Sequence, residues 1–196
     1  MPTPSKYIIV AALDMETPDL DQFAPVIHTG VGKLNAAISI YEAILFHKPE
    51  RVVNYGTAGT VSGKTGLLKV DTFIQRDMDV RGLGVPRGVT PFENNEKLPD
   101  AKGIVLASGD SFVTDSELHL EGLDIEIDLI DMEAYALQKV CAHHNTHFDC
   151  YKYVTDSTDN EASNDWVENV AKGATLFLDV LEKKYGKSIL YNHYFK

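Results

Sequence analysis

The sequence predicts an α/β protein in which helices are layered on a β-sheet. Short apolar runs rich in β-branched residues alternate with segments of helical periodicity, and small or acidic residues follow nearly every run. The 196 residues suit a single domain, because a chain of this length buries about 70% of the surface that its unfolded form exposes. We therefore expect one domain, 1–196, whose ligand binds beyond the carboxyl ends of the strands.

The first two elements are a buried strand and a helix. Residues 7–13 form an apolar run typical of a strand buried on both faces, and acidic residues follow it directly. The segment 33–49 carries apolar residues at helical spacing and stops before Pro49. We expect this helix to turn its apolar stripe towards the core. The stripe consists of Leu34, Ile38, Tyr41, Ile44 and Leu45.

Further strands and two helices continue the alternation. A helix is expected after the junction 131–133, where Asp131 could cap the first turn. A last helix starts at Ser163 or Asn164 and ends at Gly186. The apolar runs predict strands over 50–59, 67–75, 103–108, 127–130 and 148–155. The apolar face of the last helix consists of Trp166, Val170, Ala174, Phe177 and Leu181.

The segment 77–100 has no lasting period and contains three prolines and three glycines. An irregular stretch of this length inside a compact domain is usually functional or in contact with a partner. Its apolar residues lack the regular structure that would bury them, and exposed apolar patches mark interfaces. We expect the segment to lie against a second copy of the chain; the alternative is that it folds back on its own domain as an ordered loop. These apolar residues are Val80, Leu83, Val85, Val89 and Phe92.

Composition favours a small-molecule ligand. The chain has 29 acidic and 18 basic residues, and its formal net charge of −11 disfavours nucleic acid and an anionic membrane as partners. Only Cys141 and Cys150 occur, without a CxxC motif, so neither a disulfide framework nor a structural zinc site is indicated. The apolar run near the start reaches Asp14 too soon for a signal sequence or a membrane span. We predict a cytoplasmic protein.

Several common catalytic motifs are missing from the sequence. It contains no GxxxxGK[ST], GxSxG or HExxH pattern. GTAG at 56–59 and GVGK at 30–33 could each cradle an anion with backbone N–H groups, or simply form turns. His143 and His147 have the i, i+4 spacing of a metal-ligand pair, with His144 beside them, but this cluster reads equally well as a polar helix end. We predict no metal and no cofactor.

Carboxylates and hydroxyls follow the predicted strands. In an α/β sheet these loops meet at one edge, and capping alone explains such a concentration poorly. At the junction 131–133, Asp131 suffices as a cap, which leaves Glu133 without a structural task. A set of converging carboxylates suits general acid/base catalysis at an uncharged bond of a polyhydroxyl substrate. The loops contain Asp14 and Glu16, Thr57, Ala58 and Gly59, Ser108 and Asp110, Asp131, Met132 and Glu133, and residues 156–161.

Five segments in order resemble the nucleoside phosphorylase/nucleosidase superfamily, and most closely the 5'-methylthioadenosine/S-adenosylhomocysteine nucleosidases. The segments are GVGKLNAA, VVNYGTAGTV, ASGDSFVTD, IDLIDMEAYALQKVC and YKYVTDSTDNEA. The resemblance implies a three-layer α/β/α sandwich with a central mixed, mostly parallel sheet. It also implies hydrolysis of a purine N-glycosidic bond in methionine salvage, and a homodimer in which the segment 77–100 walls the partner's sugar pocket.

The resemblance assigns a role to each loop. Asp156 would deliver a proton to N7 of the base, and Glu16 would orient or deprotonate the attacking water. Glu133 would hold the ribose hydroxyls with Met132 packed beside the sugar. A carboxylate placed there in advance stabilises the cation-like sugar of the transition state.

The base side and the lining are assigned in the same way. Phe112 would stack on the base, and the backbone of Val113 would read its edge. Thr57, Ala58, Gly59 and Lys152 are the remaining substrate-binding candidates. Asp156 could instead cap the turn that follows it, which is the structural alternative to its role as an acid.

Three departures from the family pattern concern the sugar side. The stretch 18–30 is shorter than is usual, Asp131 stands where the pattern has glutamate, and Lys152 stands where it has arginine. Lysine keeps the charge but loses the bidentate fork of arginine. The reaction type is unaffected, but the 5'-substituent and the preferred base stay open.

Two rival functions are left by the sequence. A phosphorylase should present arginines to phosphate, whereas the first strand-end loop carries Glu16, which repels an anion and suits water. A protein that only binds a nucleoside would not need Glu16, Glu133 and Asp156 together.

Overall fold

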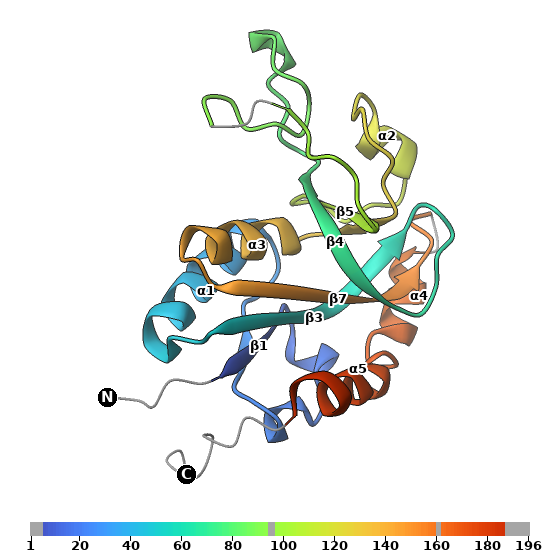
Figure 1. The fold of residues 1–196 in the computed structure, drawn as a ribbon. Coiled ribbons are helices and arrows are strands. Elements are labelled where there is room, and N and C mark those ends of the chain that lie inside the picture. The colour runs from blue at the N-terminus through green and yellow to red at the C-terminus, as the bar shows by residue number, and fades with distance from the viewer. Residues whose placement is uncertain (1–5, 94–96, 160–161, 187–196) are drawn as a thin grey trace.

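The computed structural model describes residues 6–93, 97–159 and 162–186, and a seven-stranded sheet forms its centre (Figure 1). The predicted strand over 67–75 is found with the same bounds, and the other predicted strands are found with small shifts. A short strand, β2, was not predicted. The strands are β1 (Tyr7–Ala11), β2 (Val26–His28), β3 (Arg51–Thr60), β4 (Leu67–Gln75), β5 (Ile104–Ser108), β6 (Leu129–Asp131) and β7 (His147–Asp156).

The sheet is mixed and mostly parallel, as expected. Its order is β2-β1-β3-β6-β5-β4-β7, with a further pairing of β3 with β7 that closes part of it into a ring. β3 with β6 and β4 with β7 are antiparallel, and the other pairings of the described strands are parallel. A register shift between Ala58 and Gly59 lets β3 follow β7 and pair with β6 at its end. This closure brings the ends of β3, β6 and β7 together.

Helices cover the sheet in two groups (Figure 1). α1 (Lys33–His47) and α3 (Ala134–His143) pack together over one face, with a core that includes Ile8, Val52 and Leu137. α5 (Ala174–Val180) covers the other face, where the rings of Tyr55 and Phe177 stack with centroids 4.5 Å apart. The layered α/β architecture is therefore confirmed.

The predicted core face of α1 is wrong. Of the apolar stripe, only Ile44 is buried, whereas Leu34 and Ile38 are 72% and 52% exposed. The helix instead packs through Ala36, Ile40 and Ala43. Small residues let the helix approach the sheet closely, and this leaves the larger side chains of the stripe facing outwards.

The predicted last helix is broken into separate pieces. α4 (Ala162–Asn169) ends before a turn that contains Gly173, and α5 is followed by a π-helical turn, Leu181–Tyr185. A Cβ atom on Gly173 would lie 2.3 Å from the ring of Tyr153, so the chain approaches β7 more closely there than a regular helix with side chains allows. The predicted apolar residues from Val170 onwards are nevertheless buried.

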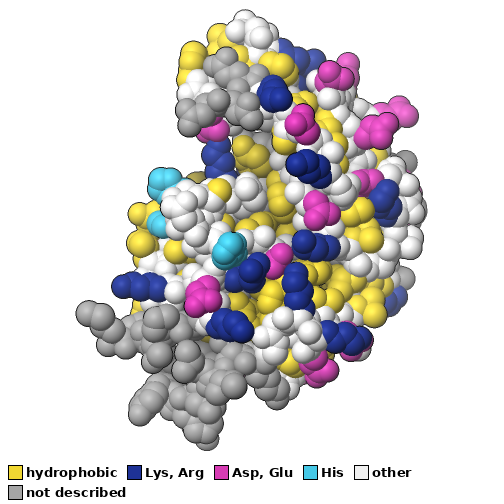
Figure 2. Space-filling model, viewed as in Figure 1, with side chains coloured by type: hydrophobic (Ala, Val, Ile, Leu, Met, Phe, Trp, Pro, Cys, Tyr) yellow, Lys and Arg dark blue, Asp and Glu magenta, His cyan; other side chains and the backbone are white. Residues whose placement is uncertain are grey.

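The segment 77–100 projects from the sheet beside α2 (Ser116–Leu120), at the top of Figure 1. It contains one 3-10 turn, Arg81–Leu83, in its described part; residues 94–96 lie outside the described residues. Val89 is buried, but Leu83 and Phe92 are exposed. In Figure 2 the same region carries hydrophobic side chains interspersed with charged ones.

The described residues contain neither a membrane-spanning helix nor a metal-binding group of side chains. No helix among them is both long and apolar enough to cross a membrane. Within 6–93, 97–159 and 162–186, no three or more His, Cys, Asp or Glu side chains are grouped so that they could hold a metal ion. The two cysteines are free and buried.

Candidate active site

A cavity of about 340 Å³ lies where β1, β3, β6 and β7 end. It is lined by every candidate residue from the sequence except Lys152. These lining candidates are Glu16, Thr57, Ala58, Gly59, Phe112, Val113, Met132, Glu133 and Asp156. The loops that follow the strands therefore do meet at one edge.

Asp156 is the last residue of β7, and its side chain is buried against the cavity. Thr155 Oγ1 donates to one carboxyl oxygen (2.9 Å) and the backbone N–H of Thr158 donates to the other (3.1 Å). Burial and the neighbouring Asp165 and Asp159 outweigh these hydrogen bonds and raise the pKa of Asp156. The group is therefore biased towards holding a proton.

Gly59 on β3 makes room for this acid. A Cβ atom at this position would lie 2.6 Å from Asp156 Oδ1 and 2.4 Å from the methyl group of Thr158. Any side chain would displace the carboxyl group or the turn that holds it. The glycine is needed here for close approach, not for its backbone angles.

The junction between β6 and α3 separates its two carboxylates. Asp131 Oδ2 accepts from the backbone N–H of Ala134 (2.9 Å), the first residue of α3, but the N-cap position is Glu133, whose side chain makes no capping hydrogen bond. Glu133 points into the cavity and accepts from the N–H of Gly32 (2.8 Å). Burial, with a contribution from Asp131, raises the pKa of Glu133 to about 7.

Lys152 lies behind the cavity wall. It is 2% exposed, and its Nζ is 2.8 Å from Asp131 Oδ2. Burial disfavours its charge, but Asp131 and Glu133 more than compensate and raise the pKa of Lys152. The lysine therefore supplies a buried positive charge to the two carboxylates of the junction without lining the cavity itself.

Glu16 also lines the cavity and is held there by hydrogen bonds. One oxygen accepts from the N–H of Leu13 (3.0 Å), and the other accepts from the N–H and the hydroxyl of Thr57 (2.9 Å each). Trp166 Nε1 donates to the same hydroxyl (3.0 Å), and an indole N–H cannot accept. The hydroxyl proton of Thr57 is thus directed at Glu16, which fixes the carboxylate.

The two glycine-rich loops hold protein carboxylates. In GVGK the N–H of Gly32 binds Glu133, and in GTAG the N–H of Thr57 binds Glu16. Both loops were candidate anion cradles. Their N–H groups do bind anionic side chains, and they fix the carboxylates at the cavity wall.

Some lining residues were missed. The sequence placed Trp166 on a core face, whereas it lines the cavity from α4. Thr155 and Thr158 flank Asp156 in sequence, and this proximity was the available signal. Val31, Ser111 and others lie in loops, where position depends on distant contacts. The remaining unpredicted lining residues are Ala12, Leu13, Ile130 and Ser163.

Curated relatives align with most of this chain. A 5'-methylthioadenosine/S-adenosylhomocysteine nucleosidase of Geobacillus thermodenitrificans is 28% identical over 202 residues, covering 89% of this chain and 86% of the relative. The enzyme of the same name from an Exiguobacterium species is 30% identical over 166 residues, covering 70% and 69%.

Solved structures share the fold. A Helicobacter pylori 5'-methylthioadenosine/S-adenosylhomocysteine nucleosidase superposes with a TM-score of 0.78 at 20% identity, covering 91% of this chain and 98% of the other. Futalosine hydrolase of the same species gives 0.79 at 20% identity, covering 91% and 96%. The phosphorylase superfamily model matches residues 11–183. The chain therefore belongs to the phosphorylase superfamily.

Proposed function

We propose that the protein hydrolyses the N-glycosidic bond of a purine nucleoside of the 5'-methylthioadenosine/S-adenosylhomocysteine type, which releases the free base and the sugar. The observation that carries the proposal is the convergence of Glu16, Glu133 and Asp156 on one cavity. The names of the curated relatives support the same reaction and substrate class.

Asp156 acts as the general acid in this proposal. Its raised pKa favours the protonated form, and the carboxyl group is held by two hydrogen bonds at the cavity wall. Protonation of the base at N7 makes the base a better leaving group. The structural alternative, a cap of the following turn, is also satisfied by the bond from Thr158, so only the rate of a variant separates the two.

Glu133 and Met132 form the sugar side. Glu133 can accept hydrogen bonds from ribose hydroxyls, and its pKa of about 7 allows the ionised form near neutral pH. When the glycosidic bond breaks, the sugar gains positive charge, and a fixed carboxylate stabilises that charge more in the transition state than in the substrate.

Glu16 orients the attacking water. Its carboxylate is held by Leu13 and Thr57 and lines the cavity. No lysine or arginine lines the cavity among the described residues. A phosphate nucleophile would meet a carboxylate at this wall, so water is favoured over phosphate.

Phe112 and Val113 form the base side. Both line the cavity from the loop after β5, and the ring of Phe112 is 46% exposed, which leaves its face free to stack on a planar base. Thr57, Ala58 and Gly59 complete the lining below the sugar.

A product assay tests the function. The protein is incubated with methylthioadenosine, S-adenosylhomocysteine, adenosine, inosine and futalosine, with and without phosphate, and the released base and sugar are identified. We expect free base and free sugar at a rate independent of phosphate. A sugar 1-phosphate would establish a phosphorylase, and binding without turnover on every substrate would establish a nucleoside-binding protein.

We further propose that the protein is a homodimer. The outward stripe of α1 exposes Leu34 and Ile38, and the segment 77–100 exposes Leu83. The two segments meet where Lys33, at the start of α1, pairs with Asp77. A second copy of the chain would cover both, and the segment 77–100 would lie near the partner's cavity.

Matched charge variants test the dimer. In Ile38→Asp and Leu83→Asp, a charge enters the proposed interface, and an unpaired buried charge costs several kcal/mol. We expect sedimentation to show monomers and turnover to fall. Leu176→Asp, at an exposed apolar residue of α5 on the other face of the sheet, is the control. A fully active wild-type monomer at assay concentration would contradict the proposal.

Two further expectations stay predictions. A cytoplasmic location is expected from the cysteine usage and the start of the sequence, and a role in methionine salvage is expected from the resemblance. The product assay bears on the second, because it identifies the 5'-substituent that the protein accepts.

A further inference from the structure

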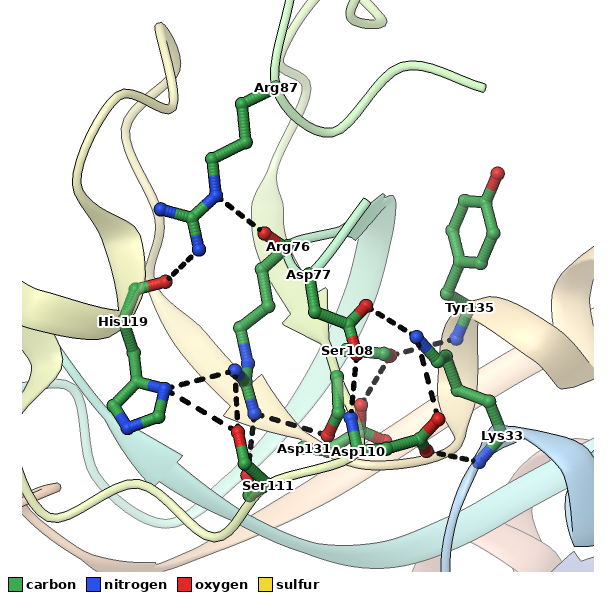
Figure 3. A network of polar contacts seen from close by, with 11 residues as sticks. Lys33, Arg76, Asp77, Arg87, Ser108, Asp110, Ser111, His119, Asp131 and Tyr135 are labelled. Atoms are coloured by element: carbon green, nitrogen blue, oxygen red, sulfur yellow. Dashed lines mark hydrogen bonds and ion pairs between the residues drawn. The ribbon is translucent and has the colours of Figure 1, made fainter. Parts of the chain in front are cut away.

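Arg76 is a buried cation immediately after β4, and it lies under the loop that leads to the base side of the cavity (Figure 3). Its side chain is 1% exposed. Nη2 donates to the carbonyl oxygens of Gly109 (3.1 Å) and Ser111 (2.6 Å), and Nη1 donates to the hydroxyl of Ser111 (3.1 Å). The planar fork of the guanidinium therefore binds one short loop at three points.

The loop is built to accept this guanidinium. A Cβ atom on Gly109 would lie 2.7 Å from Arg76 Cζ, so a side chain there would displace the fork. The neighbouring Asp77 accepts from the N–H of Asp110 (2.9 Å). Two consecutive residues of one segment thus hold three consecutive residues of the loop.

The loop connects both sides of the cavity. Ser111, Phe112 and Val113 line the cavity directly. Asp110 accepts from the N–H of Lys33 (2.7 Å). Gly32, the residue before Lys33, donates its N–H to Glu133. In Figure 3, Arg76, Asp77 and Lys33 surround the loop from different elements. The position of the base wall therefore depends on Arg76.

We propose that Arg76 is a positioning residue that holds Phe112 and Val113 where a purine base binds. The inference rests on the proposed function, because it assigns the base to this wall. Arg76 itself does not line the cavity, so it acts through the loop. A buried guanidinium that served only stability would not determine the affinity for the base.

Binding of free adenine and steady-state kinetics test the proposal. In Arg76→Met the loop loses its three hydrogen bonds, and we expect both the dissociation constant of adenine and KM to rise about tenfold or more, since each bond contributes on the order of 1 kcal/mol. The carboxylates remain, so kcat should change much less than KM. Arg76→Lys, which keeps one donor group, should be intermediate.

Two controls separate positioning from stability. Arg51→Met removes a partly buried cation at the other end of the sheet, and it should leave adenine affinity unchanged. Gly109→Ala keeps Arg76 but displaces its fork, and it tests the contact even if Arg76→Met does not fold. It should weaken adenine binding in the wild type and have no further effect in Arg76→Ala.

The outcomes distinguish the two proposals. A wild type that neither binds adenine nor releases a base would overturn the proposed function and this inference with it. A wild type that does both, with unchanged adenine affinity in Arg76→Met or additive effects of Gly109→Ala and Arg76→Ala, would overturn this inference alone.

Discussion

β7 carries a buried aspartate near each end, and the surroundings shift the pKa values of the two aspartates in opposite directions. Asp149 and Asp156 are both 8% exposed. Burial alone would raise both pKa values, but hydrogen bonding from Tyr185 and the charges of Lys184 and Arg51 lower the pKa of Asp149, whereas Asp156 has acidic neighbours and a raised pKa. Equal burial on one strand thus produces a structural anion at one end and a potential proton donor at the other.

The difference lies in the partners that each end of the sheet supplies. Arg51 Nη1 is 2.6 Å from Asp149, and Tyr185 donates to it at 2.8 Å. Asp156 is bound by neutral donors from its own turn. A buried carboxylate that lacks a cation is costly for stability, and such groups concentrate where chemistry needs them.

Removing each carboxylate in turn should have the largest effect. Asp156→Asn cannot deliver a proton, and we expect base release to fall by about 10² to 10⁴-fold with nucleoside binding within a few-fold. Asp149→Asn is the matched control, and it should retain turnover within a few-fold. Unchanged turnover in Asp156→Asn would return this residue to a capping role.

The Lys152–Asp131 and Arg51–Asp149 ion pairs, at the two ends of the sheet, should differ in their contribution to the free energy of unfolding. Lys152→Met leaves Asp131 buried without its cation, and we expect unfolding in urea to become easier by about 3–5 kcal/mol. Arg51→Met should cost about 1 kcal/mol or less, because Asp149 keeps Lys184 and Tyr185. Equal losses would contradict the contrast between the two ends.

The pH dependence of stability should separate Glu133 from Asp149. The folded pKa of Glu133, about 7, lies above its ordinary value of 4.5, so the folded state binds more protons and loses stability as pH rises between these values. Glu133→Gln removes that loss. We expect its stability relative to wild type to increase by about 2–3 kcal/mol from pH 5 to pH 8, a change of about 5–10 °C in Tm.

Asp149 should show the reverse sign. Its lowered pKa contributes stability that is present above the ordinary value of 3.8 and is lost as pH falls through the folded pKa. Asp149→Asn should therefore be less stable than wild type at pH 7, and the difference should shrink below about pH 4. Thermal unfolding of both variants across pH measures this. Parallel curves for the two variants would contradict the opposite assignments.

The same contrast explains what the sequence could predict. Strand ends such as Asp156 and the junction 131–133 can be recognised locally, because an apolar run is followed by polar residues. Strand ends of an α/β sheet meet at one edge, and this rule correctly predicted that Glu16, Glu133 and Asp156 lie together. The hydrogen bond that Asp131 accepts from Ala134 at the start of α3 is equally local, although the N-cap residue itself is Glu133.

Features set by distant contacts could not be predicted. α1 carries apolar residues on two sides, and only tertiary packing decides that Ile40, not Leu34, faces the sheet. Trp166 reaches Thr57 across 109 positions of sequence. Lys152 was assigned to the substrate, whereas its partner is Asp131, and whether it also affects substrate binding stays a prediction.

The most direct test of this account is the titration of the two aspartates themselves. ¹³C NMR of labelled carboxyl groups, assigned with Asp149→Asn and Asp156→Asn, would follow each group as pH changes in the free protein. The account predicts a pKa for Asp156 above the ordinary value of 3.8 and a pKa for Asp149 below it. A pKa for Asp156 at or below that of Asp149 would contradict the central claim, that their surroundings make one aspartate the proton donor and the other a structural anion.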